Sequence, residues 1–162
     1  MEIGIVLTVG EYFLIIIFLL GKVVNGAKMS IIFKKFINRE YIKNNPTKYF
    51  VFGDNDMRVG TGGQAKEMRG EPNSIGVRVK KYPGNISIAY YSDIQYDFNV
   101  IKITEDFDIV KKYLKGGCDV VIPEDKIGTG LAKLKVFAPK TLKFINDKIK
   151  ELCDKYGVKQ ED

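Results

Sequence analysis

Histidine is absent from the 162 residues of this chain, and cysteine occurs only twice. Histidine is the most frequent general base near neutral pH and the most frequent metal ligand, so both roles fall to other side chains here. Cys118 and Cys153 lie far apart and match no zinc-binding spacing, which indicates reduced thiols in a cytoplasmic protein. The sequence therefore predicts no metal centre and no cofactor, and it restricts acid–base chemistry to Asp, Glu, Lys, Tyr or bound water.

The chain also lacks any block of like charges, although its formal net charge is +6. Hydrophobic residues make up 45% and charged residues 28%, a composition typical of one globular domain and not of a disordered chain. The lysines are spread along the sequence, and two interpretations of them remain open. They form an ordinary solvated surface, or they attract a phosphate-bearing ligand or nucleic acid.

The first 28 residues differ from the rest in their apolar composition. Residues 3–20 are almost wholly apolar, apart from Glu11, and match the roughly 20 residues that cross a bilayer. A membrane span, a dispensable extension and a buried core helix all fit this pattern. Lysines follow the segment and only Glu2 precedes it, so a span would leave the rest of the chain in the cytoplasm. We place the start of the folded domain, residues 29–162, at Met29.

Short apolar strands alternate with helices after Met29. Strands are predicted over residues 31–36, 49–52, 74–79, 86–90 and 119–122, and helices over residues 64–68, 105–115 and 139–156. Thr104 is a suitable N-cap for the second helix, and Pro139 is a suitable first residue for the last one. This alternation predicts an α/β fold, a single domain with a mixed, mostly buried sheet flanked by helices.

Two glycine-rich segments, each placed after a short apolar strand, carry the strongest functional signal. The first glycine segment, residues 60–64, reads Gly-Thr-Gly-Gly-Gln, and the second, residues 127–131, reads Ile-Gly-Thr-Gly-Leu. Backbone N–H groups in such turns hold phosphates. We predict that residues 53–73 and residues 128–130, which contain the glycines of both segments, line one cleft at the carboxyl ends of neighbouring strands. A side chain at Gly63 or Gly130 would block close approach and disfavour a positive φ. A flexible turn is the alternative for either segment alone.

Polar side chains accompany the first glycine segment on both sides. Asp54 and Asn55 end a buried strand and can accept hydrogen bonds from ribose or an adenine amino group, or else form an Asx-rich turn. On the loop that follows, Arg69 can clamp a diphosphate, Glu71 can orient or deprotonate water, and Asn73 can donate to a ribose oxygen. The alternative is an Arg–Glu pair that only holds the shape of this loop.

The spacing of these residues resembles an uncharacterised domain family of phages and bacteria. The matching string is Phe52-Gly-Asp-Asn, Arg58-Val-Gly, Gly62-Gly-Gln-Ala, Arg69-Gly-Glu-Pro-Asn73 and, later, Ile127-Gly-Thr-Gly-Leu-Ala132. The family commonly continues Gly-Ile-Pro-Thr-Lys after this string, whereas this chain has Gly76-Val-Arg-Val-Lys80.

More distantly, the layout resembles macrodomains, α/β modules that bind ADP-ribose between two glycine-rich loops, although their usual Asn-Ala-Ala-Asn string is missing. This resemblance implies a macrodomain-like fold that binds ADP-ribose or a related nucleotide diphosphate and, if it is an enzyme, hydrolyses an ADP-ribosyl linkage. The predicted catalytic residues are Glu71 and Asp54, and the predicted ligand-binding residues are Asn55, Arg58, Gly62, Gly63, Gln64, Arg69, Asn73, Gly128, Thr129 and Gly130. A nucleic-acid-binding accessory protein with a Lys-rich surface and a membrane-tethered interaction module are the alternatives.

Overall fold

Five parallel strands form the centre of the structure, a computed structural model that describes residues 29–125 and 127–160. Their order in the sheet is β3-β2-β4-β1-β5. The strands are β1 (Ile31–Lys34), β2 (Tyr49–Asn55), β3 (Ser74–Lys80), β4 (Val120–Pro123) and β5 (Val158–Lys159). All pairs of these strands are parallel, so the predicted mixed sheet is wrong. The reason is that every connection between consecutive strands contains a helix, which returns the chain to the same end of the sheet.

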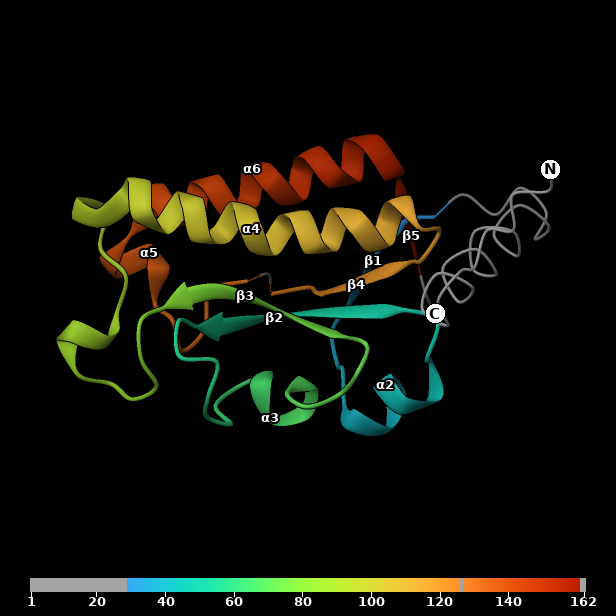
Figure 1. Cartoon of the computed structure of the whole chain (residues 1–162), viewed down its shortest axis with the longest axis horizontal. Helices are drawn as coiled ribbons and strands as arrows, with labels where there is room; N and C mark the ends of the chain where they lie inside the picture. The colour runs from blue at the N-terminus through green and yellow to red at the C-terminus, as the bar shows by residue number, and fades with distance from the viewer. Residues whose placement is uncertain (1–28, 126, 161–162) are drawn as a thin grey trace, which may run out of the picture.

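Helices cover both faces of the sheet (Figure 1). The long helices α4 (Tyr96–Lys115) and α6 (Pro139–Tyr156) lie side by side on one face, and the short helices α2 (Arg39–Asn44) and α3 (Ala65–Met68) lie on the other. A large apolar cluster fills the α4/α6 side, and a smaller one fills the α2/α3 side. In β4, Val120 and Ile122 belong to the first cluster and Val121 to the second, which explains why this strand is apolar throughout.

Two of the predicted elements differ in the structure. Residues 86–90 contain a 3₁₀ turn, η1 (Ser87–Ala89), in place of a strand. The helix predicted after Thr104 begins earlier, at Tyr96, directly after a second 3₁₀ turn, η2 (Asp93–Gln95). The side-chain amide of buried Asn99 donates to the Ser92 carbonyl at 3.0 Å and to Thr141 Oγ1 at 3.3 Å. These tertiary contacts with the start of α6 favour helix before Thr104, where local propensity indicated none.

No helix in the described parts of the chain combines the length and the apolar composition that a membrane crossing requires. Residues 3–20, for which a membrane span was one of three interpretations, lie outside the described residues, as does everything else before Met29.

The chain changes faces of the sheet between the neighbouring strands β2 and β4. After β2 it enters α3 on one face, whereas after β4 it passes through α5 (Leu134–Phe137) into α6 on the other. The loops that leave two adjacent carboxyl ends therefore diverge. In open α/β sheets such a switch point is where ligand crevices form.

Candidate nucleotide cleft

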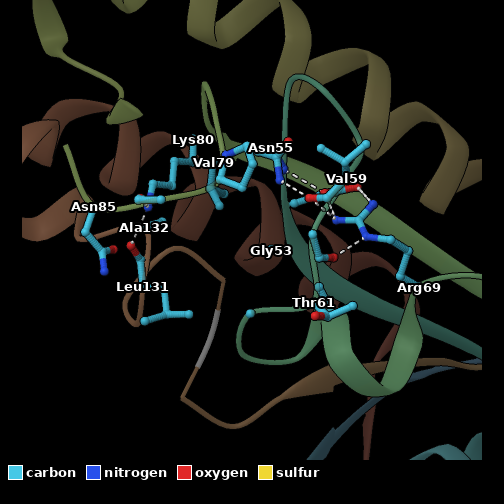
Figure 2. A pocket seen from close by; sticks show the side chains of 16 residues that line it. Gly53, Asn55, Val59, Thr61, Arg69, Val79, Lys80, Asn85, Leu131 and Ala132 are labelled. Carbon is cyan, nitrogen blue, oxygen red and sulfur yellow. Dashed lines mark hydrogen bonds and ion pairs between the residues drawn. The ribbon is translucent and has the colours of Figure 1, made fainter. Parts of the chain in front are cut away.

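The two glycine segments line one cleft at the carboxyl ends of β2, β3 and β4 (Figure 2). A cavity of about 360 Å³ is lined by residues 62–64 of the first segment and by Gly128, Gly130 and Leu131 of the second. An adjoining cavity of about 280 Å³ shares five of its lining residues, which are Gly53, Gly62, Val79, Leu131 and Ala132. The prediction of a shared cleft is confirmed for parts of both predicted ranges, but residues 70–73 and Thr129 line neither cavity.

Positive φ angles occur in both glycine segments. In the first, φ is +91° at Gly60 and +57° at Gly63. In the second, φ is +89° at Gly128, where an added Cβ would overlap the side chain of Leu134. Gly130 does not have a positive φ, and an added Cβ there would meet nothing within 4 Å. The predicted backbone requirement is therefore confirmed at Gly63 but wrong at Gly130, because the tight turn of the second segment falls at Gly128.

Among the described residues, the backbone N–H groups of the two glycine segments, residues 60–64 and residues 127–131, have no protein acceptor. The buried side-chain oxygen of Gln64, which lines the larger cavity, also has no partner in this part of the chain. Backbone N–H groups of glycine turns that lack a protein acceptor are the kind of donor that binds a phosphate.

Asp54 is buried at the end of β2 inside a network of ion pairs. Its carboxylate accepts hydrogen bonds from both terminal nitrogens of Arg69, and from Arg58 at 3.3 Å. Arg58 also donates to buried Asp106 at 2.5 Å, and Asp106 in turn accepts from Arg78 Nε at 2.9 Å. Burial lowers the pKa of Arg78, but its hydrogen bonds to Asp106 and Glu105 outweigh this and raise it. The network fixes the end of the edge strand β3 against β2 and α4.

Arg69 and Asn55 hold the loop that leads into the first glycine segment. Arg69 Nε donates to the Gly60 carbonyl at 2.7 Å, while the amide of Asn55 donates to the Val59 carbonyl at 2.7 Å. The Asn55 side-chain oxygen accepts from the backbone N–H of Met57 at 3.1 Å. Both side chains line the smaller cavity (Figure 2), but their polar atoms are directed to the protein itself.

Four predicted site residues lie outside the lining of the cleft. Glu71 accepts from Arg39 at 2.5 Å, which is the loop-holding Arg–Glu pair expected as the alternative, although its partner is not Arg69. Asn73 donates its amide to three backbone carbonyls, those of Ile42, Asn45 and Lys48. Thr129 donates its hydroxyl to the Asp125 carbonyl at 2.6 Å. Glu71 and Arg58 line a separate cavity of about 380 Å³ together with Asp54 and Arg69.

Eight of the predicted site residues line the two adjoining cavities. They are Asp54, Asn55, Gly62, Gly63, Gln64, Arg69, Gly128 and Gly130.

Sequence reasoning missed Lys80, which ends β3 and lines the smaller cavity with only 8% of its surface exposed. The sequence contained a signal for this residue, because a lysine is the last residue both of Gly76-Val-Arg-Val-Lys80 and of the family string Gly-Ile-Pro-Thr-Lys. No group of three or more potential metal ligands occurs among the described residues.

An Arg69→Lys substitution tests how far Arg69 supports the cleft. The guanidinium contacts Asp54 and two loop carbonyls at once, and a single ammonium cannot reproduce that fork. We expect the free energy of unfolding, measured by urea denaturation, to fall by about 1–3 kcal/mol. An unchanged value would show that these contacts contribute nothing to stability.

The profile of a family of unknown function, DUF7831, matches residues 32–148, and the chain belongs to that family. The predicted membership of an uncharacterised domain family is thereby confirmed. A search of curated proteins and a search of solved structures each gave no match.

Proposed function

We propose that this protein binds ADP-ribose or a related nucleoside diphosphate in the cleft between its two glycine segments. One observation carries the proposal. The two glycine segments both line one cavity at the switch point of the sheet, and their backbone N–H groups donate to no described acceptor. Backbone N–H groups of this kind can donate to the oxygens of a diphosphate, so that a side-chain donor is not needed for each phosphate oxygen. The adjoining cavities, about 360 and 280 Å³, match the size of pockets that hold small molecules.

We infer binding in preference to hydrolysis. The two carboxylates predicted to be catalytic, Asp54 and Glu71, are both paired with arginines, and Glu71 lies outside the cleft. A general base must reach the water that it activates. Asp125 lines the larger cavity, and its side chain forms no ion pair within the described residues. If hydrolysis is detected, Asp125 is therefore the carboxylate to test first.

The nucleic-acid alternative draws less support from the surface. Several lysines are paired with nearby carboxylates, which reduces the positive charge they present to a nucleic acid. Examples are the pairs Lys143–Asp147, Lys150–Asp154, Lys148–Glu151 and Lys159–Asp119.

Isothermal titration calorimetry distinguishes the two functions. We expect ADP-ribose and ADP to bind and adenosine to bind weakly or not at all, because adenosine has no phosphate for the glycine segments. We expect the affinity for ADP-ribose to change little between about 50 and 200 mM salt, whereas binding to a nucleic-acid backbone falls by about a thousandfold or more. Equal, weak binding of all three compounds, together with salt-sensitive binding of DNA or RNA, would favour the alternative.

A further inference from the structure

The ammonium group of Lys80 joins the two walls of the smaller cavity. It donates to the carbonyl of Gly84, in the loop after β3, and to the carbonyl of Leu131, in the second glycine segment, at 3.4 Å. Figure 2 shows the side chain reaching between Asn85 and Leu131. An ammonium has three N–H donors, and no third oxygen acceptor for Lys80 is present among the described residues. One N–H of Lys80 therefore has no oxygen acceptor within the described residues.

The charge of Lys80 is not balanced by any described carboxylate. Two acids of the neighbouring strand and its loop are engaged elsewhere: Asp54 pairs with Arg58 and Arg69, and Asp56 pairs with Lys102. A buried charge without a counterion is unfavourable unless other groups compensate for its desolvation.

A second ammonium, that of Lys133, lies close to Lys80. Both ammonium groups contact the ring of Tyr90, with their nitrogens 4.4 Å and 5.7 Å from its centroid. Lys133 follows the second glycine segment and has a φ of +48°, and it also forms no ion pair with a described carboxylate. Burial, and then the charge of Lys133, lower the pKa of Lys80. Lys133 lines neither cavity, so Lys80 is the ammonium that a ligand in the cleft can reach, and a bound anion would stabilise its charged form.

We propose that Lys80 binds a phosphate oxygen of the ligand and makes the cleft selective for a nucleotide that carries a diphosphate. This inference rests on the proposed function and adds a charged partner to the backbone donors. The Leu131 carbonyl that holds Lys80 belongs to the second glycine segment, so the ammonium lies beside the turn assigned to the phosphates.

The test compares Lys80→Met with Lys81→Met by calorimetry. Methionine keeps the length and apolar stem of lysine without its charge, and Lys81 is the next residue along the chain but does not line the cleft. We expect Lys80→Met to weaken ADP-ribose binding by about 10- to 100-fold, the range of a hydrogen bond to a charged group, and Lys81→Met to change it by less than about twofold. Thermal melting of both variants shows whether each is folded.

The pH dependence of binding provides a readout that a merely structural role would not change. Because the bound phosphate requires the charged ammonium, the affinity should fall as pH rises through the lowered pKa of Lys80, before an ordinary lysine would lose its proton. Lys133 and Tyr90 also face this group, and subtracting the profile of Lys80→Met removes their contribution. Lys80→Arg should bind ADP-ribose and lack this decline, because arginine stays charged.

The outcomes separate this inference from the proposed function. If wild type binds ADP-ribose and Lys80→Met binds it equally well, the inference is wrong and the proposed function stands. If wild type does not bind ADP-ribose, the proposed function is wrong, and titration with inorganic pyrophosphate then decides the inference. Pyrophosphate binding that is lost in Lys80→Met supports the anion site, and no pyrophosphate binding overturns it.

Discussion

Replacing Asp54 by Asn is expected to lower the free energy of unfolding by about 3–5 kcal/mol, the cost of removing one partner of a buried ion pair. The side chain of Asp54 is 3% exposed and accepts from both Arg58 and Arg69. Asparagine has nearly the same shape, but it is neutral and its amide would place donors against guanidinium donors. The total free energy of unfolding of a small domain is about 5–15 kcal/mol, so this one substitution is expected to remove a large part of it.

The matched control for this prediction is Asp108→Asn, because Asp108 is 64% exposed and its nearest cation, Lys111, lies 3.9 Å away. An exposed pair of this kind contributes little, so the control should change stability by less than about 0.5 kcal/mol. Urea denaturation of both variants gives the comparison. If Asp54→Asn is no less stable than Asp108→Asn, the ion-pair network does not hold the cleft together as described.

Replacing Gly63 by Val is expected to abolish the proposed binding, with a loss of about a hundredfold or more in affinity for ADP-ribose, or about 2.7 kcal/mol. A Cβ at this position would lie 3.6 Å from Leu131 Cδ1, on the opposite wall of the cleft. The branched side chain would therefore cover the backbone donors that the phosphates need. It would also strain the turn, because φ is +57° there.

The control for backbone strain is Gly70→Val. Gly70 has a φ of +88°, and an added Cβ there would meet nothing within 4 Å, but this glycine does not line the cleft. Both variants should melt at a lower temperature than wild type, and only Gly63→Val should lose affinity in calorimetry. Equal losses of affinity in the two variants would mean that strain, and not the blocked cleft, explains the effect.

Much of the local structure could be predicted from the sequence, because local rules determine it. The apolar runs of β2, β3 and β4 and the segment from Pro139 to Gly157 carry the periodicity and the end signals of their elements. The beginning of α4 could not be predicted in this way. It depends on Asn99, whose partners Ser92 and Thr141 are brought together only by the tertiary fold.

The candidate site was predictable as a pair of glycine segments but not as a set of side-chain roles. The strand order that makes β2 and β4 neighbours is not encoded by any local pattern. The role of Gly76 also could not be predicted from local sequence. The pattern indicates an ordinary glycine within a strand, yet a Cβ at this position would overlap the Asp54 carboxylate, which comes from the neighbouring strand. The roles of Asp54, Arg69 and Lys80 likewise depend on partners from other elements.

The proposed function requires that the two glycine segments bind one ligand together. The most direct measurement is a ¹H–¹⁵N NMR titration of the labelled protein with ADP-ribose. We predict that amide signals of residues 60–64 and of residues 127–131 shift together, with a single dissociation constant, while those of α2, which lines neither cavity of the cleft, do not. Saturating ligand that shifts only one of the two segments, or neither, would contradict the account.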